Sequence, residues 1–497
     1  MAYLLGIDIG TSGTKTAIFS ETGDLIESAA VEYPLYQPQN GYAEQDPDDW
    51  WGAVQNSIKE TVKKSGVNDI SAIGLSGQMH GLVMLDKSGK HLSRSIIWCD
   101  QRTADECVEI TTAVGAERLV EITANPALTG FTASKIMWVK IMWVKKHRPE
   151  LYEKCAHILL PKDFIRFKLT GEFAAEVSDA SGTQLLDVRN RCWSDEVLSK
   201  LGIDKSLLPK VFESPEISGR LCKKAAEALG LKAGIPVAGG AGDCAASAIG
   251  SGICEEKKAM TTIGTSGVVF AHTDKMLTDK KGRIHTFCHA VPGAWHVMGV
   301  TQSAGLSIKW LKENLNFASY KELDEAAADV LPGANRLIYL PYLMGERTPH
   351  LDPDARGVFF GLSASHTRKE LARAVLEGVS FSLLDCYNVF RETGIETAEM
   401  TVCGGGGKSP VLRQILSDMF MLDIKVLRSD EGAALGAALI AGTGAGIYKD
   451  IHEACKTAVK VNNAETFDPK CRYEGYYRLY RELYANMKGS FKTLSKL

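Results

Sequence analysis

The start of the chain alternates short apolar runs with breaks of glycine and polar residues, a pattern typical of strands. Leu4–Ile9, Thr16–Phe19 and Leu25–Val31 are three such runs, and Gly10 and Gly13 stand between the first two. Because glycine marks tight turns, we expect a meander of three consecutive strands.

A helix should follow at Asp46-Pro-Asp-Asp-Trp. An acidic residue precedes a proline in the first turn, and Trp50, Val54 and Ile58 then recur at helical spacing. Ile70–Leu75 and Gly81–Leu85 return to strand character. This order predicts a mixed sheet flanked by helices.

The second half of the chain repeats the pattern. Ala259–Ile263 and Val268–Ala271 predict strands, and Met400–Cys403 predicts a strand that leads into a run of glycines. A chain of 497 residues is also longer than one core of about 100–200 residues. We therefore predict an α/β protein of two lobes, residues 1–244 and 245–497.

One pentapeptide, Ile-Gly-Thr-Ser-Gly, occurs at Ile9–Gly13 and again at Ile263–Gly267. Glycine lets a backbone approach a ligand closely, and threonine and serine add hydroxyl and N–H donors. One copy alone could equally be a plain glycine-rich hairpin. Two copies, one in each lobe, predict a pair of loops that hold a nucleotide polyphosphate from both sides of a cleft.

The residue before each copy differs. Asp8 precedes the first pentapeptide, whereas Thr262 precedes the second. A carboxylate beside a polyphosphate is a usual Mg²⁺ ligand, and a carboxylate among apolar neighbours is costly without a partner. Asp8 is therefore the predicted metal ligand.

A second aspartate follows glycines at Gly239-Gly-Ala-Gly-Asp243. Asp243 could simply cap the next helix. The glycines clear space around its carboxylate, however, and the small residues that follow suit a close helix crossing. A matching small-residue helix is predicted at Glu431–Ala438, and we expect the two helices to cross at the interface between the lobes.

Composition narrows the class of protein. The formal net charge of −3 gives no reason to expect nucleic acid or an acidic membrane surface as partner. The N-terminal residues lack the features of a signal peptide, and no apolar run is long enough to cross a bilayer. The 12 cysteines form no Cys-x-x-Cys pair, which favours reduced thiols in the cytoplasm over a zinc site.

Taken together, these motifs resemble the FGGY carbohydrate kinases of the actin-like ATPase superfamily. Gly6–Lys15 and Thr261–Gly267 resemble its two phosphate motifs, Val402–Pro410 its adenosine motif, and Gly357–Glu377 its longer signature. The resemblance implies two ribonuclease-H-like lobes, each a mixed five-stranded sheet flanked by helices. It also implies ATP and Mg²⁺ as cofactors and a sugar as substrate.

The resemblance extends to individual residues. Ser76-Gly-Gln-Met-His-Gly81 is similar to the loop of the family branch that phosphorylates D-xylulose, and Trp98-Cys-Asp-Gln-Arg102 is similar to a segment beside the sugar, with Cys99 where Asn is common. The implied catalytic residues are Asp243, as general base, and Asp8. The implied sugar-binding residues are Gln78, Met79, His80, Trp98, Asp100 and Asp243. The implied ATP-binding residues are Thr11, Ser12, Gly13, Lys15, Gly264, Thr265, Ser266, Gly404, Gly405, Gly406 and Lys408.

The sequence leaves open the identity of the acceptor, the oligomeric state and the effect of a repeat in the shorter family signature. Ribulose, gluconate or a deoxyketose is an alternative acceptor, and a nucleotide-driven actin-like ATPase without kinase activity is a more distant alternative. A homodimer is possible from the resemblance alone. The shorter family signature, from Lys135 to His147, is interrupted because Ile136-Met-Trp-Val-Lys is repeated at once as Ile141-Met-Trp-Val-Lys. A tandem duplication absorbed at a helix end is our interpretation.

Overall fold

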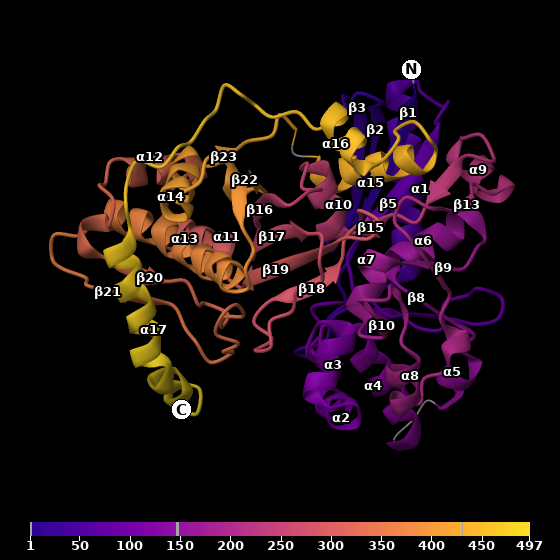
Figure 1. Ribbon diagram of the computed structural model, residues 1–497, viewed down its shortest axis with the longest axis horizontal. Helices are drawn as coiled ribbons and strands as arrows, with labels where there is room; N and C mark the ends of the chain where they lie inside the picture. The colour runs from indigo at the N-terminus through magenta and orange to yellow at the C-terminus, as the bar shows by residue number, and fades with distance from the viewer. Residues whose placement is uncertain (1, 146–148, 430) are drawn as a thin grey trace.

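The computed structural model describes residues 2–145, 149–429 and 431–497, and it describes no side chains for residues 140–151. Two sheets with their helices lie side by side (Figure 1). The helices are α1 Pro47–Ser65, α2 Ala104–Val114, α3 Ala116–Thr123, α4 Thr132–Lys145, α5 Pro149–Lys154, α6 Pro161–Thr170, α7 Val177–Ala180, α8 Asp195–Leu201, α9 Lys223–Leu229, α10 Asp243–Gly250, α11 Ala304–Asn314, α12 Tyr320–Ala328, α13 Arg368–Glu392, α14 Pro410–Phe420, α15 Gly432–Gly444, α16 Ile451–Ala458 and α17 Glu474–Leu494.

In the described residues the first sheet has seven strands in the order β13-β14-β5-β1-β2-β3, with β15 beside β5. The bounds are β1 Tyr3–Ile9, β2 Gly13–Ser20, β3 Leu25–Glu32, β5 Ala72–Gly77, β13 Ile217–Arg220, β14 Pro236–Ala238 and β15 Ala241–Gly242. The first three strands form the predicted antiparallel meander. Strands β1, β5, β14 and β15 run parallel.

The second sheet has six strands over the described residues, in the order β18-β19-β17-β16-β22-β23. The bounds are β16 Lys257–Ile263, β17 Gly267–Thr273, β18 His285–Cys288, β19 Trp295–Thr301, β22 Thr397–Cys403 and β23 Ile424–Lys425. Strand β16 pairs antiparallel with β17 and parallel with β22. The hairpin β1–β2 with its parallel neighbour β5 thus has a counterpart in β16–β17 with β22.

Short two-stranded ribbons complete the structure: β4 Glu44–Gln45 with β7 Ser95–Ile96, β6 Val83–Leu85 with β8 His157–Leu159, β9 Ala174–Glu176 with β12 Lys210–Phe212, β10 Leu186–Asp187 with β11 Cys192–Trp193, and β20 Ile338–Leu340 with β21 Val358–Phe360. The mixed α/β architecture with two sheets is confirmed. The expectation of five strands per sheet is wrong, because β13, β15 and β18 extend the two sheets.

Alternate residues of β1 pack into two different hydrophobic clusters, one on each face of the sheet. Leu5, Ile7 and Ile9 face the side covered by α1, in a cluster with Trp50, whereas Leu4 packs with α15 on the opposite side. This follows from the two-residue period of a strand. Asp46 caps α1 through its side chain, and Pro47 lies in the first turn, as predicted.

Helix α15, which follows the strands of the second sheet in the chain, covers the first sheet (Figure 1). A Cβ at Gly6 of β1 would lie 2.0 Å from Ala434 O, and one at Gly74 of β5 would lie 1.8 Å from Ala437 O. Helix α15 also crosses α10 in backbone contact, because a Cβ at Gly436 would lie 1.8 Å from Ala246 O. The predicted close crossing of these two small-residue helices is confirmed.

The duplicated pentapeptide lies in one continuous helix, α4. The second copy has no described side chains, so the relative orientation of Trp143 and Trp138 lies outside the described residues. Among the residues described, no helix combines the length and the apolar character needed to cross a bilayer.

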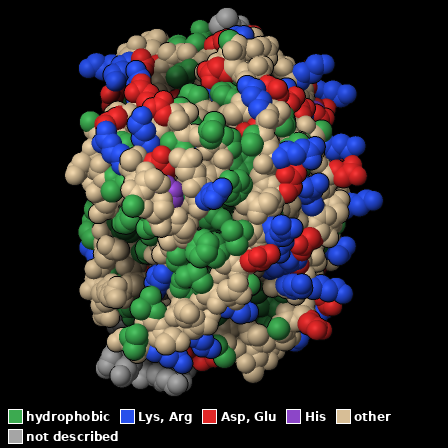
Figure 2. Space-filling view, turned by 90° about the vertical axis from the view of Figure 1, so that its left-hand side faces the viewer, with side chains coloured by type: hydrophobic (Ala, Val, Ile, Leu, Met, Phe, Trp, Pro, Cys, Tyr) green, Lys and Arg blue, Asp and Glu red, His purple; other side chains and the backbone are tan. Residues whose placement is uncertain are grey.

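We call the first sheet with the helices packed on it the first unit, and the second sheet with its helices the second unit. Figure 2 shows a face of the second unit on which apolar side chains gather between groups of charged ones. The large hydrophobic side chains that this unit exposes include Leu331, Met344, Phe360 and Leu362.

Candidate active site

Three parallel strands of the first sheet end at the same edge. Strand β1 ends at Ile9, β5 at Gly77 and β15 at Gly242, and Ser76 of β5 lies between Asp8 on one side and Ala241 on the other. Ligands bind outside the carboxyl ends of such strands. The topology therefore places Asp8, the loop after β5 and Asp243 together.

Asp8 lies at this edge with one carboxylate oxygen lacking a partner in the described residues. The side chain is partly buried, and its Oδ1 is the buried unpaired atom. Burial raises the pKa of Asp8, while the Ser76 hydroxyl and the Lys15 charge act against this shift. A partly buried carboxylate with an open oxygen is suited to a cation.

Asp243 is the first residue of α10 and not its cap, because Gly242 occupies the N-cap position. Its Oδ1 accepts a hydrogen bond of 2.7 Å from Cys244 N. Burial, followed by the charge of Asp8, raises the pKa of Asp243 to about 6. The carboxylate is thus ionised at neutral pH and more basic than an ordinary aspartate, as a general base requires.

The glycine before Asp243 makes room for the loop after β5. A Cβ at Gly242 would lie 2.8 Å from Cγ of Met79, which is 5% exposed. His80 follows with φ of 70°, a left-handed conformation that is uncommon outside glycine. The strand ends therefore bring Met79 and His80 to the edge that holds Asp243.

The ring of His80 is held in one tautomer. Its Nδ1 lies 2.7 Å from the carbonyl of Gly182, which can only accept, so Nδ1 carries the proton. Burial and the charge of Lys135 lower the pKa of His80 to about 3. The ring is neutral at physiological pH, and Nε2 is a hydrogen-bond acceptor.

The other expected sugar residues differ in their environment. Gln78 donates to Gln45 Oε1 at 2.7 Å. Trp98 is 45% exposed, and its Nε1 donates to Thr11 Oγ1 at 2.9 Å. Asp100 is fully buried and its oxygens accept from Ala43 N and the Arg102 guanidinium. Asp100 therefore fixes its own loop.

The two pentapeptide loops lie at the ends of equivalent strands, β1 and β16. Both expose a hydroxyl residue, Ser12 in the first loop and Thr265 in the second, and Ser266 is partly exposed. The side chains of Ser12 and Thr265, both predicted to bind phosphate, are therefore accessible.

A cavity of about 240 Å³ joins the two units, and both halves of the chain line it. Asp8 and Lys15 come from the first sheet, and Thr262 and Gly404 come from the second. The Lys15 ammonium lies 2.6 Å from the carboxylate of Glu431, which also lines the cavity. This ion pair links residues at opposite ends of the sequence, and Glu431 as its partner was not predicted.

Of the eleven expected ATP-binding residues, two line this cavity, Lys15 and Gly404, whereas the residues of the two pentapeptide loops, Thr11, Ser12, Gly13, Gly264, Thr265 and Ser266, do not. Gly405, Gly406 and Lys408 do not line it either: Gly405 caps a short 3₁₀ helix that runs from Gly406 to Lys408, and Lys408 is exposed. A Cβ at Gly406 would lie 2.4 Å from Cγ2 of Ile263. At least one of these glycines is therefore needed for contact within the protein.

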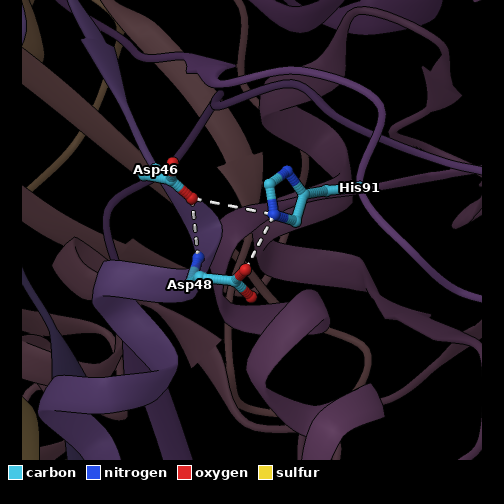
Figure 3. Close-up of side chains that lie close together, drawn as sticks. All are labelled: Asp46, Asp48 and His91. Carbon is cyan, nitrogen blue, oxygen red and sulfur yellow. Dashed lines mark hydrogen bonds and ion pairs between the residues drawn. The ribbon is translucent and has the colours of Figure 1, made fainter.

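Away from this site, Asp46, Asp48 and His91 form the one group of three or more His, Cys, Asp or Glu side chains in the described residues that lie close enough together to share a metal ion (Figure 3). The Asp46 carboxylate already has a structural use, because its Oδ1 caps α1 by accepting from Asp48 N at 3.0 Å. The Nε2 atom of His91 lies 3.2 Å from Asp48 Oδ2. The N-terminal end of a helix dipole also disfavours a cation, so we assign these residues to the helix cap.

Comparisons with known proteins agree with the geometry. Residues 3–250 match the N-terminal domain of the FGGY family of carbohydrate kinases, and residues 259–445 match its C-terminal domain. The xylulose kinase of Bacillus subtilis is 38% identical over 98% of both chains. The crystal structure of xylulose kinase from Rhodospirillum rubrum superposes with a TM-score of 0.90, at 28% identity over 99% of this chain and all of that one.

A gluconokinase of Bacillus subtilis is less similar, at 32% identity over 88% of this chain and 87% of that one. The chain belongs to the FGGY family of carbohydrate kinases. It is therefore an ATP-dependent sugar kinase, which confirms the family, fold and enzyme class predicted from the motifs.

Proposed function

We propose that this protein transfers the γ-phosphoryl group of ATP to D-xylulose, giving xylulose 5-phosphate and ADP. The observation that carries this proposal is the meeting of Asp8, Asp243 and the Met79-His80 loop at one edge of the first sheet. The xylulose kinases among its relatives, at higher identity than the gluconokinase, support the choice of sugar.

Asp243 acts as the general base in this proposal. The sugar hydroxyl oxygen forms a bond to the γ-phosphorus as the bond to the bridging oxygen of ADP breaks, and the hydroxyl proton passes to Asp243. A pKa of about 6 leaves the carboxylate ionised at neutral pH. Positioned bases of this kind contribute about 10²–10⁴-fold.

His80 recognises the sugar as a hydrogen-bond acceptor. With Nδ1 committed to Gly182 O, Nε2 can accept from a sugar hydroxyl. The apolar Met79 beside it supplies a wall of fixed shape. Trp98 closes the same region through its link to Thr11.

Asp8 would hold Mg²⁺, and its unpaired Oδ1 fits this role. When bound, the ion neutralises charge on the phosphate oxygens. Around it, Lys15, Thr11 and Ser12 from the first unit and Gly264, Thr265 and Ser266 from the second would donate to phosphate. The backbone of Gly404–Gly406 would lie against adenosine.

An assay of ADP release tests the proposal against its alternatives. The wild type is incubated with Mg·ATP and, separately, with D-xylulose, D-ribulose, D-gluconate, a deoxyketose and glycerol, with an Asp243→Asn variant as background. Strong stimulation by D-xylulose is expected. Stimulation by another acceptor would reassign the substrate, and ADP release independent of every sugar would favour an actin-like ATPase that is not a kinase.

A homodimer and a cytoplasmic location stay predictions. Light scattering at several protein concentrations would test the first, and fractionation of the source cells would test the second.

A further inference from the structure

The backbone of His80 depends on a segment that the proposed mechanism does not use. Two donors converge on the carbonyl oxygen of His80: Lys135 Nζ at 2.8 Å and Thr132 Oγ1 at 3.1 Å. Both residues belong to the first turn of α4. The residue before this turn, Phe131, packs against the His80 ring with centroids 4.6 Å apart.

Lys135 is unusual for a lysine because it is fully buried and no carboxylate in the described residues lies within ion-pair distance of its ammonium group. Its Nζ donates to two carbonyl oxygens, His80 O and, at 2.5 Å, Gly130 O. A buried cation without a paired anion is costly. Burial accordingly lowers the pKa of Lys135 to about 7, against the opposing effect of the Asp100 charge.

The two carbonyls belong to different parts of the sugar region. His80 O lies in the loop after β5. Gly130 packs against the Trp98 segment, because a Cβ at Gly130 would lie 2.9 Å from Trp98 O. The ammonium group of Lys135 therefore ties together two segments that the sugar is expected to contact.

The contacts also account for the backbone of His80. A left-handed conformation is unfavourable for a residue with a side chain, so it persists only where neighbours hold it. Lys135 and Thr132 hold the carbonyl, and Gly182 holds the ring. Without the first two, the His80 carbonyl loses both of these hydrogen bonds, and the ring is held by Gly182 and Phe131 on a backbone that is less firmly fixed.

We propose that Lys135, together with Thr132, is a positioning residue that fixes His80 and Trp98 for sugar binding; this inference rests on the proposed function. The duplicated pentapeptide begins one residue after Lys135, so the inserted residues leave this first turn of α4 in register. Because Lys135 is fully buried and its ammonium group is engaged by two carbonyls, its effect should appear in the affinity for sugar.

Steady-state kinetics of Lys135→Met and Thr132→Val, with sugar and ATP varied separately, test this proposal. Misplacement of a binding group by about 1 Å can cost up to about 10²-fold, so we expect the sugar KM to rise about 10- to 100-fold. The ATP KM should stay within about twofold. Thr132→Ser keeps the hydroxyl and should restore most of the affinity.

Thr61→Val is the matched control, because Thr61 is also fully buried, donates its hydroxyl to carbonyls, and lies in α1 away from the sugar loop. Its sugar KM should equal that of the wild type. If Lys135→Met does not fold, the proposal is tested by the sugar KM of Thr132→Val compared with that of Thr132→Ser.

Two results would overturn the inference. A lower melting temperature with an unchanged sugar KM would make Lys135 and Thr132 purely structural, and equal increases in both KM values would place them outside the sugar site. A wild type that phosphorylates none of the sugars would instead refute the proposed function, and the inference with it.

Discussion

The two copies of Ile-Gly-Thr-Ser-Gly share every residue and yet form different turns. In the first copy Gly10 N donates to Gly13 O, and Ile9 pairs with Thr14. In the second, Gly264 N donates to Ser266 O, and Ile263 pairs with Gly267. The second hairpin therefore closes one residue earlier.

This shift of one residue changes which side chains are neighbours, because strand residues alternate between faces. In the first hairpin Asp8 lies opposite Lys15. In the second, Thr262 lies opposite Val268. A carboxylate and an ammonium group stand beside the first loop, whereas threonine and valine occupy the paired positions beside the second.

The loops are also held by different means. Side chains bind the carbonyls of the first loop: Gln45 donates to Thr11 O at 2.7 Å, and Tyr33 OH donates to Gly10 O. Backbone N–H groups at the start of α11 bind those of the second, with Gly305 N donating to Gly264 O at 2.9 Å. Identical loops therefore acquire different surroundings, and we propose that the metal lies at the first loop, with the base Asp243 nearby at the start of α10, and that the second loop supplies phosphate donors alone.

The largest expected effect is the loss of the base beside the first loop. Asp243→Asn keeps the shape of the side chain but removes the proton acceptor, and kcat should fall about 10³-fold. ATP binding, measured by calorimetry, should stay within about twofold. Residual activity above a few per cent of wild type would remove Asp243 from this role.

Acid should have the next largest effect. Because the folded-state pKa of Asp243 is raised to about 6, the base is lost by protonation as the pH falls through this value. The kcat/KM for sugar should then decline about tenfold per pH unit below pH 6. A profile that stays flat down to pH 5, with the fold intact by circular dichroism, would contradict the assignment.

A change at Lys15 tests the importance of the ammonium group that stands beside the first loop, where valine stands beside the second. Lys15→Met removes an ammonium group that lines the cavity, and the ATP KM should rise about tenfold, the value of one charge-assisted hydrogen bond. Lys408→Met changes an exposed lysine beside the cavity and should alter the ATP KM much less. Equal effects would show that charge near the nucleotide matters more than position.

The smallest effect is expected from replacing the first glycine of each loop by alanine. A Cβ at Gly10 would lie 3.2 Å from Gly13 O, whereas one at Gly264 would lie 3.8 Å from Ser266 O. Gly10→Ala should therefore destabilise the protein by up to about 1 kcal/mol, and Gly264→Ala should hardly change the melting temperature. Both substitutions should raise the ATP KM if the loops approach phosphate closely. An unchanged ATP KM in Gly264→Ala would show that the second loop does not contact phosphate.

Local patterns in the sequence predicted much of this fold. The apolar runs of the first strands, the Asp46-Pro47 start of α1 and the two small-residue helices are features of short segments, where spacing and capping determine the outcome. Asp8 and Asp243 could be singled out because a carboxylate among apolar or glycine residues is unusual.

Features that depend on tertiary contacts could not be predicted. Lys15 and Glu431 are distant in sequence, and nothing near either residue indicates the other. Gly6 belongs to the first phosphate motif by sequence, but its missing side chain makes room for α15. The different registers of the two hairpins arise from their neighbours, since the pentapeptides are the same.

The most direct test of the asymmetry is the Mg²⁺ dependence of ATP binding in Asp8→Asn and Thr262→Val, which change equivalent positions before the two loops. Removal of a metal ligand should raise the Mg²⁺ concentration for half-saturation about tenfold or more in Asp8→Asn, and Thr262→Val should match the wild type. Equal shifts in the two variants, or no shift in Asp8→Asn, would contradict the assignment of the metal to the first loop.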